Sequence, residues 1–230
     1  MIDRDAKDKI SPQFVIVVAL FITCLVSSNI IAVKIADIFG NFIPAAIIIF
    51  PVSYIIGDIL TEVYGYSRAR QVIWLGFVCN ILAVGAFWVG GLLPAAPFWE
   101  GQEAYETILG STPRLLLASF MAYLIGELSN AAVLSKVKIW TNGRWLWGRT
   151  ITSTVVGQGL DSVVFISVAF SGVLAGGDLT ELVITQWVIK VLYEIGATPI
   201  TYVAVGYLKR IEGKDHYDND AKTDPFPRRS

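Results

Sequence analysis

Long apolar runs alternate with short polar segments along most of this chain. A bilayer core about 30 Å thick requires roughly 20 helical residues. Reading the runs by that length predicts six membrane-spanning helices, near residues 13–34, 43–63, 71–93, 114–135, 150–172 and 182–208. The pattern therefore predicts an all-α integral membrane protein with six transmembrane helices.

The composition agrees with this class of protein. Hydrophobic residues make up 54% of the 230 positions, and the mean hydropathy is +0.60, which is more apolar than soluble domains usually are. Cys24 and Cys79 both lie inside apolar runs, which argues against a disulfide framework or a thiolate metal site. The first run is longer than a signal-peptide core and lacks a small-residue cleavage site, so we expect it to remain as the first span.

The distribution of Lys and Arg predicts the orientation. The two connections 94–113 and 172–181 contain no Lys or Arg, whereas the N-terminus, the connections 64–70 and 136–149 and the C-terminal tail are basic. Because basic segments stay in the cytoplasm, we expect a multi-pass protein of the cytoplasmic (inner) membrane with both termini cytoplasmic. Residues 1–12 then form an N-terminal segment, 13–208 the six-helix transmembrane domain and 209–230 a charged, disordered tail.

Three successive spans each carry two polar side chains near membrane depth. The members of each pair are three or four positions apart and therefore share a helix face: Glu127 with Asn130, Gln158 with Asp161, and Lys190 with Glu194. An ionisable side chain in hydrocarbon is costly and marks a functional site by default. Three such pairs on neighbouring spans favour one shared polar cavity, since apolar packing would stabilise a fold equally well. The alternative is a closed ion network of Asp161, Lys190 and Glu194 with a purely structural role.

Other polar residues extend the set of binding candidates. Asn29 and Asn80 are candidates for solute contact, or alternatively for a hydrogen bond between helices. Lys34 lies at the outer end of the first span, outside the basic segments that set topology. Trp187 precedes Lys190 by three positions and can share its face.

The second span carries Asp58 and Glu62 one turn apart, shortly before Arg68 and Arg70. We treat Asp58, Glu62 and Arg68 as structural or gating candidates. Glu62 lies within reach of Arg68 and Arg70, and an interhelical or interfacial salt bridge is the structural alternative for Glu62 and for Asp58. An intramembrane enzyme with Asp58 and Asp161 as an aspartyl dyad would require a Gly-x-Gly-Asp context, which this sequence does not supply.

Further sequence features predict helix geometry and exclude several chemistries. Ser28, Ala32 and Ala36 form a small-residue stripe on the first span, and Pro51 and Pro199 should kink the second and sixth. A short helix within 100–109 is either a lid or an ordinary interfacial segment. Phosphate-loop and H-E-x-x-H motifs are absent and the single histidine lies in the tail, so we expect no enzyme, no metal, no cofactor and no nucleic-acid partner.

Several segments carry a resemblance to a known family. They are NIIAVK at 29–34, FPVSYIIGDILTEVYG at 50–65, FMAYLIGELSN at 120–130 and RTITSTVVGQGLDSVVF at 149–165. Together with Arg68-Ala69-Arg70 and the 190–193 region, these segments resemble the queuosine precursor transporter family, also called the vitamin uptake transporters. The resemblance covers nearly all of residues 14–210.

The resemblance implies an importer of 7-cyano-7-deazaguanine or 7-aminomethyl-7-deazaguanine, with a fold similar to the substrate-binding subunits of energy-coupling-factor transporters. A carboxylate of Asp161, Glu127 or Glu194 can accept two adjacent N–H groups of a guanine-like edge. Gln158 and Asn130 suit mixed edges, Lys190 can donate to the carbonyl, and Trp187, Phe165 or Tyr123 can stack on the base.

The alternative function is a substrate-binding subunit of an ATP-driven vitamin or nucleobase importer. Such a subunit usually docks through small residues on its first helix, but Ala32 and Ala36 lie toward the outer end of that span. We therefore expect the protein to act without an ATP-driven module, in contact with the lipid bilayer, and leave a homodimer open.

Overall fold

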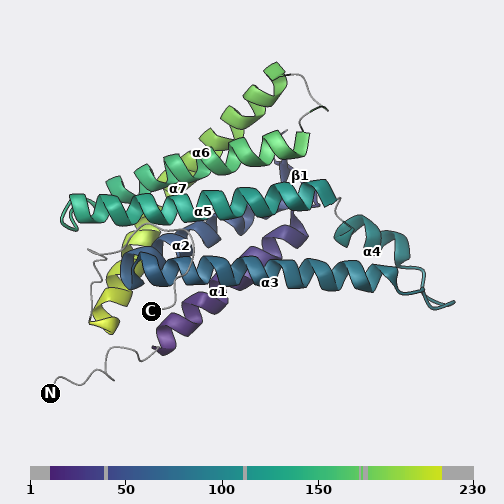
Figure 1. Cartoon of the computed structure of the whole chain (residues 1–230), viewed down its shortest axis with the longest axis horizontal. Helices are drawn as coiled ribbons and strands as arrows, with labels where there is room; N and C mark the ends of the chain where they lie inside the picture. The colour runs from purple at the N-terminus through teal and green to yellow at the C-terminus, as the bar shows by residue number, and fades with distance from the viewer. Residues whose placement is uncertain (1–10, 39–40, 111–112, 171, 173–175, 214–230) are drawn as a thin grey trace.

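The computed structural model describes residues 11–38, 41–110, 113–170, 172 and 176–213 (Figure 1). The predicted N-terminal segment up to residue 10 and the predicted disordered tail from 214 lie outside these residues. The long helices are α1 (Pro12–Ile31), α3 (Tyr66–Leu92), α5 (Pro113–Trp140), α6 (Leu146–Phe170) and α7 (Gly176–Glu212). Each of these five contains a stretch long and apolar enough to cross a membrane. The all-α membrane class is thus confirmed for the helical part of the chain.

The predicted second span, 43–63, is wrong in its first part. Strands β1 (Ile35–Ile38) and β2 (Asn41–Pro44) form an antiparallel hairpin, followed by the short 3-10 helix η2 (Ala45–Ile48). Helix α2 (Phe50–Tyr64) begins only afterwards. Its 15 residues correspond to about 22 Å, so six full-length spans and the likeness to energy-coupling-factor subunits stay predictions.

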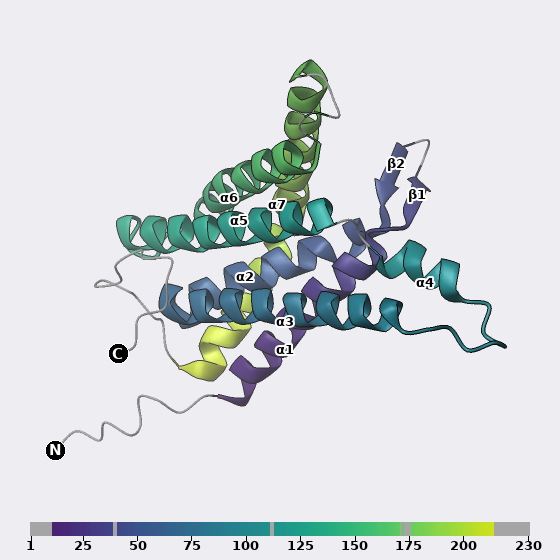
Figure 2. The ribbon, with the colours of Figure 1, turned by 45° about the vertical axis from the view of Figure 1, so that its right-hand side comes forward.

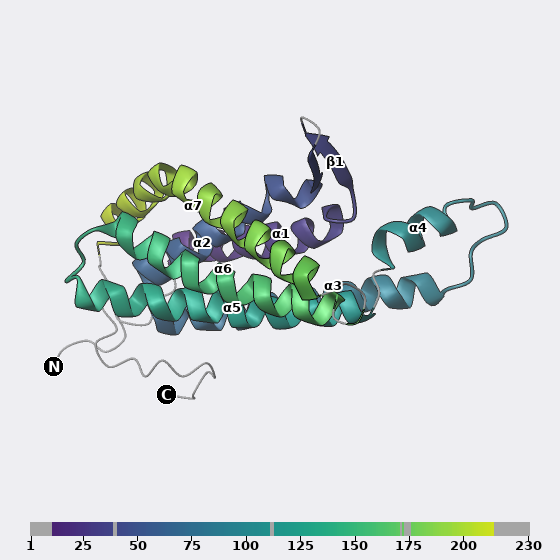
Figure 3. The ribbon, with the colours of Figure 1, turned by 90° about the horizontal axis from the view of Figure 1, so that it is seen from above.

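The two predicted kink sites, Pro51 and Pro199, occupy different positions in their helices. Pro51 lies in the first turn of α2, where its missing N–H is not needed and its fixed φ suits a helix start, so it begins the helix and does not kink it. Pro199 lies inside α7, which continues as one helix from Gly176 to Glu212. Figure 3 shows that the ribbon of α7 bends along its length.

The expected small-residue stripe on the first span is also interrupted. Helix α1 ends at Ile31 with Ala32 as its C-cap, and Ala36 belongs to β1. Only Ser28 of the stripe is helical, and its hydroxyl donates to the carbonyl of Leu25. The three positions therefore do not form one helix face.

Helix α2 lies at the centre of the bundle. Figure 2 shows it between α5 on one side and α1 with α3 on the other, and it also packs against α7. Every residue from Ser53 to Tyr66 is buried, and Leu60 and Val63 belong to a core that includes Phe21 of α1. A short helix can hold polar groups at membrane depth here because its neighbours shield it from lipid.

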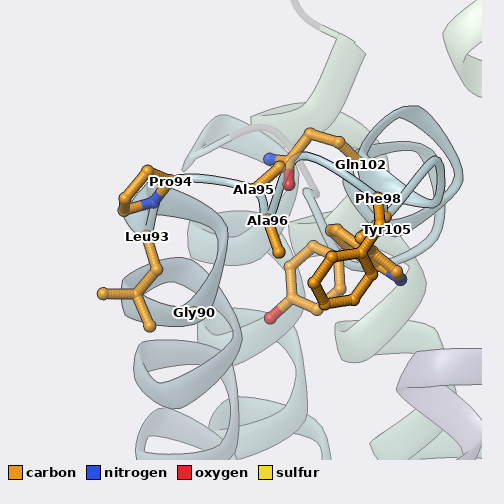
Figure 4. A pocket seen from close by; sticks show the side chains of 9 residues that line it. Gly90, Leu93, Pro94, Ala95, Ala96, Phe98, Gln102 and Tyr105 are labelled. Carbon is orange, nitrogen blue, oxygen red and sulfur yellow. The ribbon is translucent and has the colours of Figure 1, made fainter.

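The predicted short helix in the outer connection is confirmed as α4 (Gln102–Leu109). Its Tyr105 hydroxyl donates to the carbonyl of Phe87 on α3, at 2.8 Å. A cleft of about 280 Å³ lies between the end of α3 and α4, lined by Leu93, Phe98, Trp99 and Gln102 among others (Figure 4). The role of α4 as a lid stays a prediction.

Candidate functional site

Helices α5 and α6 run side by side through a close crossing built on two glycines (Figures 1 and 3). A Cβ atom placed on Gly157 would lie 2.7 Å from the Cβ of Asn130 and 2.9 Å from the carbonyl oxygen of Gly126. A Cβ atom on Gly126 would lie 2.8 Å from the Cβ of Asp161. Each glycine precedes a polar residue of its own helix by four positions and faces the polar residue of the other helix. Because small residues allow close approach, the crossing brings two of the predicted polar pairs together.

Helix α2 supplies a further row of polar side chains toward this crossing. Tyr54, Asp58 and Glu62 follow one another at four-residue intervals, a spacing that stacks them on one helix face about 6 Å apart. All three are buried. Their contacts divide the polar interior into three layers, which we name after their order along α2.

The first polar layer consists of Tyr54, Glu127, Gln158, Asp161 and Lys190. Lys190 of α7 forms an ion pair with the Oδ2 atom of Asp161, and Tyr54 and Gln158 share a side-chain hydrogen bond. Glu127 interacts electrostatically with Asp161 and Lys190. Its Oε2 atom lies against Gly57, where an added Cβ would be 3.0 Å away. The Oε1 atom of Gln158 is buried without a hydrogen-bond partner.

The second polar layer consists of Asp58, Asn130 and Glu194. The Nδ2 of Asn130 donates to the Oδ1 of Asp58 at 2.6 Å, and the carboxyl group of Asp58 interacts electrostatically with those of Glu194 and Glu127. Asp58 Oδ2, Asn130 Oδ1 and Glu194 Oε1 are buried without hydrogen-bond partners. Of the alternative closed network of Asp161, Lys190 and Glu194, the Asp161–Lys190 ion pair is present.

The third polar layer is an ion cluster around Glu62. Its Oε1 atom lies 2.8 Å from Arg149 Nη2, 2.7 Å from Lys209 Nζ and 3.6 Å from Lys138 Nζ. Lys138 also donates to the backbone carbonyl of Glu62. These contacts join α2 to α5, α6 and α7 at one end of the bundle.

The salt bridges of Glu62 are interhelical, which is one of the two forms that the sequence predicts for it. The guanidinium group of Arg68 lies over the ring of Phe14 at 5.7 Å, and that of Arg70 lies over the ring of Tyr66 at 5.6 Å. The cations that contact Glu62 come from α5, α6 and α7, which are distant in sequence.

The remaining predicted residues lie outside the three layers. Asn29 Nδ2 donates to Asn80 Oδ1 at 2.8 Å, which is the helix-joining hydrogen bond given as their alternative role. Lys34 is exposed between α1 and β1. The Nε1 of Trp187 donates to the carbonyl of Val155 at 2.9 Å, and its ring packs against Gly159. Trp187 therefore adjoins α6 near Gln158, while the other three residues do not contribute to the polar interior.

The first polar layer provides donors and acceptors for a polar solute. It contains one ammonium group, two carboxyl groups, one amide and a phenol, and all except Lys190 are buried. A buried acceptor without a donor is costly, so the unpaired Oε1 atom of Gln158 favours a ligand that carries N–H groups. Within the described residues, no three His, Cys, Asp or Glu side chains are grouped to hold a metal ion.

Comparison with known proteins places the chain in a family. Residues 44–204 match the family described as "Putative vitamin uptake transporter", a range that contains all three polar layers except Lys209. The chain is 31% identical to the "Probable queuosine precursor transporter" of Bacillus subtilis over 182 residues, which cover 78% of this chain and 79% of that protein.

Two further relatives match over shorter ranges. The "Queuosine precursor transporter" of Escherichia coli and the "Probable queuosine precursor transporter" of Haemophilus influenzae are each 28% identical. Each match covers 53% of this chain, and 52% and 49% of the respective relatives. No solved structure matches the chain. The matched range and the Bacillus subtilis relative show that the chain belongs to the vitamin uptake transporter family, as the resemblance of its motifs predicts.

Proposed function

We propose that the protein imports 7-deazaguanine precursors of queuosine, 7-cyano-7-deazaguanine or 7-aminomethyl-7-deazaguanine, across the cytoplasmic membrane. The base binds among α2, α5, α6 and α7, in contact with the first polar layer. The observation that carries this proposal is the convergence of Glu127, Gln158, Asp161 and Lys190 at one level of the bundle. The names of the three relatives support the choice of solute.

The chemistry of the layer suits a guanine-like edge. Such an edge presents a ring N–H beside an exocyclic amine, and one carboxylate accepts both hydrogen bonds. Glu127 or Asp161 takes this role, while the Lys190 ammonium donates to the neighbouring carbonyl oxygen. The unpaired Gln158 Oε1 accepts a further N–H, so the base relieves a desolvation cost of about 1–3 kcal/mol.

The ion pair between Asp161 and Lys190 joins α6 to α7 within this layer. A buried ion pair is balanced closely between Coulomb attraction and desolvation. A base that donates to Asp161 and accepts from Lys190 can therefore enter between the two groups without leaving either charge unpaired. The aromatic ring of Trp187, packed on α6 beside this layer, is positioned to border the base.

Uptake by whole cells tests this proposal. A strain unable to make queuosine, expressing this protein alone, should accumulate labelled 7-cyano-7-deazaguanine, and Asp161→Asn should abolish the accumulation at equal membrane abundance. Glu103→Gln, on the exposed face of α4, is the matched control and should transport as the wild type does. Uptake that requires a coexpressed ATP-driven module would support the binding-subunit alternative and contradict an importer that acts on its own.

A further inference from the structure

The first two polar layers hold more acidic than basic groups. Asp58, Glu127, Asp161 and Glu194 are buried, with exposed fractions between 1% and 6%. Lys190 is the cation beside them within the two layers, where it is ion-paired with Asp161 and acts electrostatically on Glu127. Full ionisation would therefore leave three excess negative charges in these two layers, since the next cations along the bundle are bound to Glu62. Burying even one unpaired charge costs several kcal/mol, so some of these carboxyl groups bind protons.

The second polar layer is where this excess is concentrated. Asp58 on α2 interacts electrostatically with Glu194 on α7, and the neutral amide of Asn130 on α5 donates to Asp58. The other titratable neighbours of Asp58 are Glu127 on α5 and Glu62 on α2, and the cations of the third layer are bound to Glu62. Like charges at such a site cannot both be ionised.

The hydrogen bonds of this layer point to the same conclusion independently of charge. Asn130 serves only one oxygen of Asp58, and the other oxygen, Oδ2, is buried without a donor or acceptor. Glu194 Oε1 is likewise buried without a partner. A carboxylate oxygen that has lost water and gained no donor is strongly disfavoured, whereas a protonated, neutral carboxyl group is buried at a much lower cost. No three acidic, cysteine or histidine side chains among the described residues are arranged as metal ligands.

We propose that Asp58 and Glu194 form a proton-binding site that couples entry of the base to inward movement of a proton. This inference rests on the proposed function. The site lies one helical turn from the first layer on α2, and Asn130 connects it to the α5–α6 crossing. A proton taken up from the outer side binds to the carboxylate of Asp58 while the base binds in the first polar layer. The base and the proton are then released to the cytoplasm. The first two polar layers return to the outer side without the base and with Asp58 deprotonated.

Reconstitution of the purified full chain separates base exchange from proton coupling. Liposomes of phosphatidylethanolamine and phosphatidylglycerol are loaded with unlabelled 7-cyano-7-deazaguanine, and entry of the labelled base is followed at equal pH. In a second assay, empty liposomes receive an inward gradient of about one pH unit with the membrane potential clamped. One proton per neutral base then allows about tenfold accumulation in the wild type.

Asp58→Asn is the informative variant. The substituted amide keeps an oxygen that accepts from Asn130, but it cannot bind and release a proton. The variant should therefore exchange the base at equal pH as the wild type does, and under the gradient should reach only equal concentrations inside and outside. Glu103→Gln should behave as the wild type in both assays.

Several results would overturn the coupling. They are wild-type exchange without any response to the pH gradient, accumulation driven by a sodium gradient instead, and tenfold accumulation by Asp58→Asn. Loss of exchange in an Asp58→Asn protein that elutes as the wild type does would place Asp58 in base binding and also reject the assignment. Absence of exchange in the wild type would refute the proposed function itself, and the coupling with it. The wild-type gradient assay decides the question even where the variant does not fold.

Discussion

The close crossing of α5 and α6 should be sensitive to a single methyl group. In Gly157→Ala the new Cβ would lie 2.7 Å from the Cβ of Asn130, whereas ordinary contacts begin at 3.4 Å. One helix must therefore move by about 0.7 Å, and it cannot do so by turning a flexible side chain, because the second obstacle is the carbonyl oxygen of Gly126 at 2.9 Å. Overpacking of this kind costs about 1–3 kcal/mol, which exceeds the gain of up to about 1 kcal/mol from the better helix propensity of Ala.

This shift should affect transport more than folding. Asn130 and Asp161 sit at the crossing, so their separation loosens both the Asp58–Asn130 hydrogen bond and the Asp161–Lys190 ion pair. We expect Gly157→Ala to lower the thermal midpoint of the purified protein by several degrees and to reduce base exchange at least tenfold, as misplacement of site groups by about 1 Å typically does.

Gly85→Ala is the matched control for this substitution. Gly85 lies in α3, and an added Cβ would meet nothing within 4 Å. This variant should keep wild-type exchange and an unchanged or slightly higher midpoint, because Ala favours the helix. Equal midpoints and equal exchange in Gly157→Ala and Gly85→Ala would refute the account of the crossing.

Two further predictions concern the rest of the bundle. Glu62→Gln removes the carboxylate from buried Arg149 and should destabilise the purified protein by about 3–5 kcal/mol. Exposed Glu103→Gln should change stability by less than about 0.5 kcal/mol, and equal midpoints for the two variants would contradict a structural role for the cluster. The basic segments predict the orientation: with Cys24 and Cys79 replaced by Ser, a membrane-impermeant maleimide should label Thr107→Cys on intact cells and label Arg210→Cys only after permeabilisation. The opposite labelling pattern would reverse the topology.

The sequence predicted much of the fold because span length and hydropathy are local properties. Five of the expected spans agree with long helices, and i,i+3 and i,i+4 spacing correctly grouped the polar pairs on single helix faces. The prediction of the second span was wrong because one apolar run covers two structures, part of a β-hairpin and helix α2. Both are apolar, so hydropathy does not separate them. Pro51 marks the start of α2, since it lies in the first turn of that helix.

The hydrogen-bond and ion-pair partners of the polar side chains could not be predicted from the sequence, because they depend on which helices pack against each other. Asp58 was assigned to structure or gating, yet it accepts a hydrogen bond from Asn130, seventy-two positions away. The sequence places Glu62 within reach of Arg68 and Arg70, yet the cations that Glu62 contacts come from α5, α6 and α7. One signal was available: Gly126 and Gly157 each precede a polar residue of a predicted pair by four positions, which is the spacing of small residues at close helix crossings.

Equilibrium binding of labelled 7-cyano-7-deazaguanine to the detergent-purified protein tests the central claim most directly. The wild type should bind one base per chain, and Asp161→Asn, which removes the charge that faces Lys190, should lose at least tenfold in affinity while it elutes and melts as a folded protein. Glu103→Gln should bind as the wild type does. Wild-type affinity in the Asp161→Asn protein would contradict a binding site in the polar layers between α2, α5, α6 and α7.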